Sequence, residues 1–188
     1  MKIPAKIVKF LDSKKIKYEI VEHKTVYTAY DKAATLKIKP NVIGKTLVLK
    51  ASGGLVMVLV PGNKNLDLAK ITRLREAEAC FGEAKARLRS KGASARQGKI
   101  SFVSEKVLKN KFKGVKLGAI PPFGELWLGS PEHGGGGKLP LFLDKELMRQ
   151  RFIFVSSGIY EASFKLSPRV FEKLGAVLGN FSKAKSHR

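Results

Sequence analysis

The chain has 188 residues, a length typical of one domain, and its 44% hydrophobic and 28% charged residues favour a globular protein. Its longest uninterrupted apolar run, residues 55–60, is far shorter than the roughly 20 residues that a membrane-spanning helix needs. The segment after Met1 lacks the apolar core and cleavage site of a secretory signal, and the single cysteine, Cys80, excludes an internal disulfide. We therefore predict a cytoplasmic protein with no membrane segment.

The charge balance is the strongest compositional signal, because 37 lysines and arginines against 15 acidic residues leave a net charge of +22. Two runs, residues 85–99 and 106–116, are rich in basic side chains and contain no acid. Such runs attract phosphate backbones without reading their sequence. They predict a polyanionic partner such as RNA, and the alternative is a generally basic surface that serves solubility.

The first part of the chain alternates between patterns typical of helices and patterns typical of strands. Apolar residues at helical spacing predict helices, and apolar residues at every second position predict strands. Thr28 and Asp31 occupy the positions where a hydroxyl caps a helix and an acid favours its first turn. The elements predicted here are a helix over 4–15, a strand over 18–22 that ends at His23, a helix over 29–36, strands over 46–49 and 55–60, and a helix capped by Asn65 or Asp67 that carries Leu66, Ala69, Ile71 and Leu74.

Lys45 opens the first strand of the predicted hairpin, at the mouth of an otherwise apolar pair of strands. Residues 51–54 between the two strands form a turn with two glycines, which is typical of a hairpin. From this segment alone, the alternative is that Lys45 is an ordinary solvated charge at a strand edge.

The second part of the chain begins with residues 83–99, which we predict to be a basic insert, partly helical or mobile. Two glycines and two prolines in residues 118–124 predict a loop of fixed shape. The tail from Ser182 is basic and is predicted to fray. The other predicted elements are a helix capped by Ser104 that carries Val107, Leu108 and Phe112, strands over 126–128, 139–143, 152–155 and 160–166, a short helical turn capped by Asp144, and a last helix that starts at Ser167-Pro168 and buries Phe171, Leu174, Val177 and Leu178.

Helices and strands are mixed without a steady βαβ alternation, which favours an α+β domain with a central mixed β-sheet flanked by helices. We assign one domain to residues 1–181 and a basic tail to residues 182–188. The three histidines and one cysteine show no spacing typical of metal ligands, so we expect no metal site and no other cofactor. The order of residues leaves a Ser/His/Asp triad open, but no nucleophile elbow occurs, so the sequence does not support nucleophilic catalysis.

Six short segments in this order resemble the YbaK/prolyl-tRNA-synthetase-associated editing domains, the free-standing aminoacyl-tRNA deacylases. The resemblance spans nearly the whole chain and implies the partly barrel-like fold of that family. The segments that carry it are His23 with Thr28 and the helix after it, residues 44–48, residues 60–63 leading to 66–68, residues 118–124, residues 139–144 and residues 155–158.

The resemblance implies a hydrolase that removes the amino acid from mischarged tRNA in trans, with substrates of the cysteinyl- or alanyl-tRNA-Pro type. The partners would be aminoacyl-tRNA and a synthetase, either prolyl-tRNA synthetase or another one. Lys45 would be essential, anchoring the terminal phosphate or ribose by its charge. Backbone N–H groups of Gly118 and Gly158 would hold the developing oxyanion of the ester.

The same resemblance assigns further residues to binding. Ala119 and Ser157 stand where family members usually have glycine, which leaves the edited amino acid open. The same two residues motivate an alternative function, that of a catalytically inactive tRNA-binding or synthetase-associated module of the same fold. The residues predicted to bind substrate are His23, Thr28, Pro121, Phe123, Gly124, Ser156 and Ser157, and those predicted to bind tRNA are Lys85, Arg87, Arg89 and Lys91.

Overall fold

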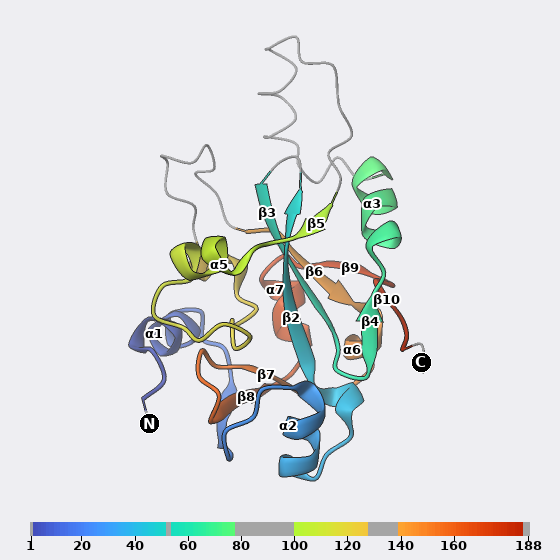
Figure 1. Ribbon diagram of the computed structural model, residues 1–188. Coiled ribbons are helices and arrows are strands. Elements are labelled where there is room, and N and C mark those ends of the chain that lie inside the picture. The colour runs from blue at the N-terminus through green and yellow to red at the C-terminus, as the bar shows by residue number, and fades with distance from the viewer. Residues whose placement is uncertain (1, 52–53, 78–99, 128–138, 186–188) are drawn as a thin grey trace.

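The computed structural model describes residues 2–51, 54–77, 100–127 and 139–185 (Figure 1). Its helices are α1 (Ala5–Ser13), α2 (Ala29–Leu36), α3 (Leu68–Ala77), α5 (Glu105–Lys111), α6 (Lys145–Met148) and α7 (Arg169–Lys173), with 3₁₀ turns η1 (Pro40–Val42) and η2 (Gly124–Trp127). Its strands are β1 (Tyr18–Glu22), β2 (Gly44–Ala51), β3 (Gly54–Pro61), β4 (Lys64–Leu66), β5 (Ser101–Phe102), β6 (Leu141–Asp144), β7 (Ile153–Ser156), β8 (Ala162–Leu166), β9 (Val177–Gly179) and β10 (Ser182–Ala184).

The described strands form a mixed five-stranded sheet in the order β5-β2-β3-β6-β9, a three-stranded sheet β1-β8-β7 and a two-stranded ribbon β10-β4. Only the pairings of β6 with β3 and with β9 are parallel among these ladders. Strands β2 and β3 form the predicted hairpin, and they are neighbours inside the large sheet, with β5 on one side and β6 on the other. One mixed sheet and two antiparallel ones, combined with separate helices, confirm the predicted α+β class.

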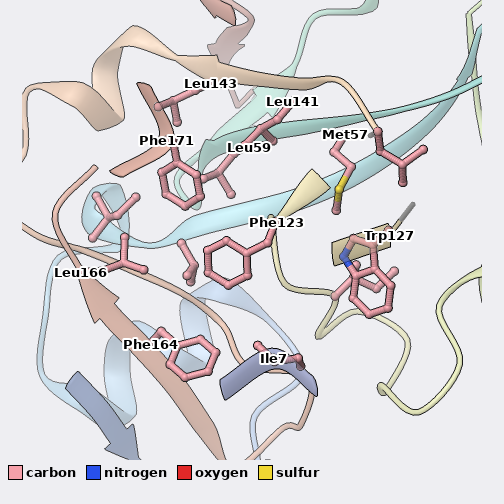
Figure 2. Close-up of a cluster of buried hydrophobic side chains, with 14 of the residues drawn as sticks. Ile7, Met57, Leu59, Phe123, Trp127, Leu141, Leu143, Phe164, Leu166 and Phe171 are labelled. Carbon is pink, nitrogen blue, oxygen red and sulfur yellow. The ribbon is translucent and has the colours of Figure 1, made fainter. Parts of the chain in front are cut away.

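Two hydrophobic clusters cover the two faces of the five-stranded sheet. On one face, Leu59 of β3 contributes to a cluster with Phe123, Phe164 and Phe171, which draws in side chains from α1, α7 and the smaller sheet (Figure 2). On the other face, Val58 contributes to a cluster that includes the side chains of Ile71, Phe142 and Phe181. Alternate residues of β3 therefore serve different cores, which explains why this strand is apolar at every position.

The helix starts illustrate how local sequence sets the boundaries. Thr28 caps α2 with a complete capping box, because its hydroxyl accepts from the Asp31 amide at 3.1 Å and the Asp31 carboxylate accepts from the Thr28 amide at 3.3 Å. Asp144 caps α6 through the Glu146 amide, as predicted. Ser104 occupies the cap position of α5, but its hydroxyl makes no capping hydrogen bond.

Two predictions for the end of the chain are wrong. The last helix does not reach Val177, because Gly175 adopts a left-handed conformation with φ of 72° and ends it after Lys173. Val177–Gly179 is instead strand β9, which pairs with β6. The predicted fraying from Ser182 is also wrong for Ser182–Ala184, which form β10 against β4.

The predicted strand over 126–128 is wrong in its described part, because Gly124–Trp127 forms the 3₁₀ turn η2. The buried Trp127 indole N–H donates to the Pro121 carbonyl at 3.2 Å, which folds the segment back onto its own loop. Strand β4 was not predicted, and it turns Leu66 from an expected helix residue into a strand residue. The basic insert over 83–99 lies outside the described residues.

Candidate functional site

Backbone hydrogen bonds join the predicted loop over 118–124 to the turn after β7. The Gly158 amide donates to the Ala119 carbonyl at 2.9 Å, and the Gly158 carbonyl accepts from the Lys116 amide at 2.8 Å. The Tyr160 hydroxyl also donates to the carbonyl of Leu117. Two segments predicted to share a site are therefore in direct contact, and we call this contact the loop–turn junction.

Gly158 is required at the junction by both its conformation and its surroundings. Its φ of 100° is one that residues with a side chain rarely adopt, and a Cβ there would lie 2.9 Å from Ile7 Cδ1 and 3.0 Å from Val115 Cγ1. The first turn of α1 thus lies directly on this glycine. Because the Gly158 amide already has an acceptor in Ala119, it serves an oxyanion only after exchanging that bond.

Gly118 is the more accessible of the two glycines predicted to bind the oxyanion. Its φ is 82°, it lies at the surface, and a Cβ there would meet nothing within 4 Å. Within the described residues, no acceptor engages its amide. This N–H can therefore donate to a ligand without breaking a bond of the fold.

The serine residues next to the loop–turn junction are buried inside the protein. Ser157 is fully buried, and its hydroxyl donates to the Ala162 carbonyl at 2.7 Å. Ser156 is paired with Ser163 across β7 and β8, and the Ser163 hydroxyl lies 2.9 Å from His23 Nε2. Ser163 is therefore in contact with the His23 ring through its hydroxyl and is the strand partner of Ser156.

The hydrogen bonds of His23 determine its tautomer. Nδ1 lies 2.9 Å from the Lys24 carbonyl, which can only accept, so this nitrogen carries the proton. Nε2 then accepts from the Ser163 hydroxyl when the ring is neutral. Burial lowers the pKa of His23, and the charge of Lys32 lowers it further, against the opposing effects of the Lys24 carbonyl and Glu161. The imidazole is accordingly neutral at pH 7.

Lys32 on α2 lies close enough to His23 for its charge to lower the pKa of the imidazole, a relationship that the sequence did not indicate. Burial lowers its pKa to about 8, so a measurable fraction of its amine is neutral near physiological pH. The sequence carries no signal for this burial, because most lysines on helices extend their charged group to solvent. Ser163 was missed for a similar reason, because its burial depends on the neighbouring strands.

His23 lines a cavity of about 570 Å³, widely open to solvent, between α1 and the β1–β8 pair. This volume lies within the range typical of small-molecule sites. Its wall is largely apolar, with Ile20 as one member, but carries charged residues of both signs, Lys2 and Lys9 from the N-terminal segment and Glu22 and Glu161 from the strands. The cavity can therefore accommodate a small group that has both apolar and charged parts.

Lys45 lies on the opposite face of the sheet from the loop–turn junction. It is paired with Val60 of the second cluster, whereas its neighbour Thr46 is paired with Leu59 of the first cluster. Its Nζ donates to the Lys64 carbonyl at 2.8 Å, and burial, followed by the charge of Lys185, lowers its pKa. The structure does not bring Lys45 together with Gly118 and Gly158.

The remaining predicted binding residues mostly support the fold around the junction. Thr28 uses its hydroxyl in the α2 capping box. Phe123 is fully buried and stacks on Phe171 with ring centroids 5.9 Å apart, so it fills the first cluster and does not line the cavity. The Pro121 and Gly124 carbonyls accept from Trp127 and Leu139. The predicted tRNA-binding residues Lys85, Arg87, Arg89 and Lys91 lie outside the described residues.

Comparison with known protein families settles what kind of domain this is. A model of the aminoacyl-tRNA editing domain matches residues 23–83 and 79–174. The chain belongs to the aminoacyl-tRNA editing domain family. The resemblance inferred from the six short segments is thereby confirmed.

Solved structures show the same fold as this editing domain. A hypothetical protein, APE2540, superposes with a TM-score of 0.71 at 18% identity, covering 95% of this chain and 99% of that one. A candidate trans-editing enzyme for prolyl-tRNA synthetase superposes with a TM-score of 0.69 at 22% identity, covering 96% of each chain. No curated protein sequence matches the chain significantly.

In the described parts of the chain, no helix is long and apolar enough to cross a membrane. Across the same residues, no three His, Cys, Asp or Glu side chains gather as metal ligands would.

Proposed function

We propose that this editing domain hydrolyses the ester bond of mischarged aminoacyl-tRNA, with alanyl- and cysteinyl-tRNA-Pro as the first candidate substrates. Membership of the aminoacyl-tRNA editing domain family is the observation that carries the proposal. Such editing answers a physical need, because a synthetase pocket gains only about 1–3 kcal/mol per methylene and so admits smaller amino acids.

The proposed chemistry needs little beyond positioning. An aminoacyl ester is already activated, and the ribose places a hydroxyl beside its carbonyl. The enzyme then has to orient a water molecule and hold the developing oxyanion. The surface-exposed Gly118 amide is the preferred donor, and one such donor is typically worth about 3–4 kcal/mol. Gly158 would hold the loop in place and donate only if its bond to Ala119 opened.

We assign the neutral His23 to substrate binding in the neighbouring cavity. Because Lys24 and Ser163 engage both of its ring nitrogens, it would contact the substrate through the carbon atoms of its ring, in a fixed position. Lys45 is assigned to a phosphate or ribose of the tRNA. An ammonium has three N–H groups, and the Lys64 carbonyl uses one of them. Because Lys45 lies on the other face of the sheet, it would act on the tRNA and not on the ester carbonyl.

An inactive tRNA-binding module of the same fold is the second candidate. Two observations favour it, since the Gly158 amide and the Ser157 hydroxyl are both engaged inside the fold. Ala119, the other departure from the family pattern, is buried beside them.

A panel of mischarged tRNAs separates the two candidates. We expect faster loss of the ester than in buffer for at least one member of the panel, measured with tRNA labelled at its terminal adenosine. An enzyme that leaves every member intact at high protein concentration would contradict the hydrolase and support the inactive module.

The role of Lys45 is tested with Lys45→Met, which keeps the aliphatic part of the side chain. Since hydrogen bonds to charged groups are worth roughly 1.5–3 kcal/mol, we expect kcat/KM to fall about 10- to 100-fold. Lys50→Met is the matched control, because Lys50 lies on the same strand and is exposed. Equal kcat/KM values for the two variants would remove Lys45 from the proposal.

A further inference from the structure

We propose, on the basis of the function proposed above, that lysines of α1 and α5 with their flanking residues form one surface that binds the phosphate backbone of double-stranded RNA. We call it the α1–α5 surface and define it as residues 2–17 and 105–116. The sequence suggested the basic insert for tRNA binding, and the α1–α5 surface is a second basic region, formed by residues that the structure describes.

Direct contacts join the two segments into one surface, although about 100 residues separate them. Lys6 Nζ donates to the Lys113 carbonyl at 2.8 Å and lies 4.1 Å from the centre of the Trp127 ring. Ile7 and Val115 both lie against Gly158. Figure 1 shows α1 and α5 on the same side of the five-stranded sheet, away from α3 and β10.

The charge of this surface is almost entirely of one sign. It carries eleven lysines and two acids, Asp12 and Glu105. Asp12 accepts from the Tyr18 hydroxyl, and among the described residues Lys14 is the only one of these lysines in an ion pair, with Glu125. The lysines are Lys2, Lys6, Lys9, Lys14, Lys15, Lys17, Lys106, Lys109, Lys111, Lys113 and Lys116.

Most of these ammonium groups are thus exposed without an acidic partner. When such lysines neutralise phosphates, the counterions condensed on the RNA are released, and this release favours binding. Lys106 and Lys109 are three residues apart on α5 and therefore lie on one side of it, where they can follow consecutive phosphates.

The composition of the surface favours a duplex over a single strand. Single-stranded RNA is typically held by exposed aromatic rings on which bases stack. On the described residues of the α1–α5 surface, Val107 is the one large hydrophobic side chain with high exposure, and no aromatic ring is similarly exposed. A surface that has lysines but no exposed aromatic rings can contact phosphates but cannot stack on bases. This suits a double-stranded acceptor stem, whose phosphates are exposed and whose bases are stacked inside.

The surface also ends where a tRNA acceptor end would be needed. Lys2 and Lys9 belong to the surface and line the cavity that contains His23. Lys116 also belongs to the surface, and its amide donates to the Gly158 carbonyl at the loop–turn junction. A duplex bound along α1 and α5 would therefore present its end to both parts of the candidate site.

The test measures binding of a labelled RNA hairpin that has a 12-base-pair stem and a four-nucleotide 3′ overhang, at several salt concentrations. The variant K106Q/K109Q/K113Q removes three charges of the α1–α5 surface that do not line the cavity. We expect binding about ten-fold weaker or more at 0.1 M salt, and a slope of log K against log salt reduced by about 2–3, since each lost phosphate contact lowers the slope by about 1.

The matched control is K145Q/K173Q/K183Q, which removes the same charge from exposed lysines on α6, α7 and β10. Equal affinities and slopes for the two triple variants would overturn the α1–α5 surface. Binding of the unmodified protein to vesicles with 30% anionic phospholipid, without binding to the hairpin, would overturn it as well. Hairpin binding that depends on α5 in a protein without deacylase activity would keep the surface and reject the hydrolase.

Discussion

The amide of Gly158 and the carbonyl of Ala119, 2.9 Å apart, connect the β7–β8 turn to the loop after α5. This bond, with Ile7 and Val115 against the same glycine, makes Gly158 the point where three chain segments meet. The junction therefore depends on the absence of a side chain at one position.

Gly158→Ala should destabilise the protein by about 2–4 kcal/mol, because a Cβ would add a clash with Ile7 and Val115 to the cost of a positive φ. Urea denaturation measures this free energy of unfolding. Gly114→Ala is the control, since Gly114 has a φ of 81° but nothing within 4 Å of a Cβ, and it should cost only about 1–2 kcal/mol. Similar costs for both would show that packing at Gly158 contributes nothing.

His23 should make stability depend on pH below neutrality. Its pKa in the folded protein lies below the ordinary 6.5, chiefly through burial, so the unfolded chain takes up a proton first as the pH falls. The free energy of unfolding should therefore fall between pH 6.5 and the folded pKa, and His23→Gln should reduce this slope. NMR titration of the imidazole measures the pKa directly, and a value of 6.5 or higher would contradict the burial argument.

Lys32 should make stability rise with pH between about 8 and 10.5. In this window the folded amine has lost its proton, since burial lowers its pKa to about 8, while the unfolded lysine keeps its own. Lys32→Met should reduce this rise, leaving the part that comes from other lysines with lowered pKa such as Lys45, and should stabilise the protein at pH 7 by about 1–2 kcal/mol, because a poorly solvated charge is removed.

Lys24→Met provides the control for Lys32, as it changes the net charge equally at an exposed position on the neighbouring segment. It should leave the stability at pH 7 within about 0.5 kcal/mol of the unmodified protein. If both variants gained the same stability, the effect would come from net charge and not from the burial of Lys32.

Asp144 should be the strongest single anchor of the C-terminal segment. Its buried carboxylate accepts from the Phe181 and Ser182 amides at 2.8 Å and from the Glu146 amide at 2.9 Å. Asp144→Asn replaces one acceptor oxygen by a donor and should cost about 2–4 kcal/mol. Hydrogen exchange should also accelerate in β4 and β10, which pair with each other.

Asp31→Asn is the matched comparison, because Asp31 is exposed and, within the described residues, its carboxylate bonds only to Thr28 in the α2 capping box. It should cost about 1 kcal/mol or less and leave exchange in β4 and β10 unchanged. An equally small effect of Asp144→Asn would mean that β10 is held by its strand pairing alone.

Features set by neighbouring residues were predictable from the amino-acid order. The capping box of Thr28 and Asp31, the cap at Asp144 and the β2–β3 hairpin each depend on residues a few positions apart, whose side chains and turn glycines act locally. The ordered short segments likewise indicated the family, because their spacing reflects one fold.

Features set by contacts between distant segments were not predictable in this way. Val177–Gly179 became a strand because β6 offers a parallel edge, which outweighs the helical spacing of its apolar residues. The face of the sheet on which Lys45 lies follows from its pairing with Val60. A shift of the strand register by one residue would place Lys45 on the other face. Likewise, the low pKa of Lys32 and the bond from Gly158 to Ala119 arise only when the chain folds, because desolvation and backbone pairing depend on which segments come to lie together.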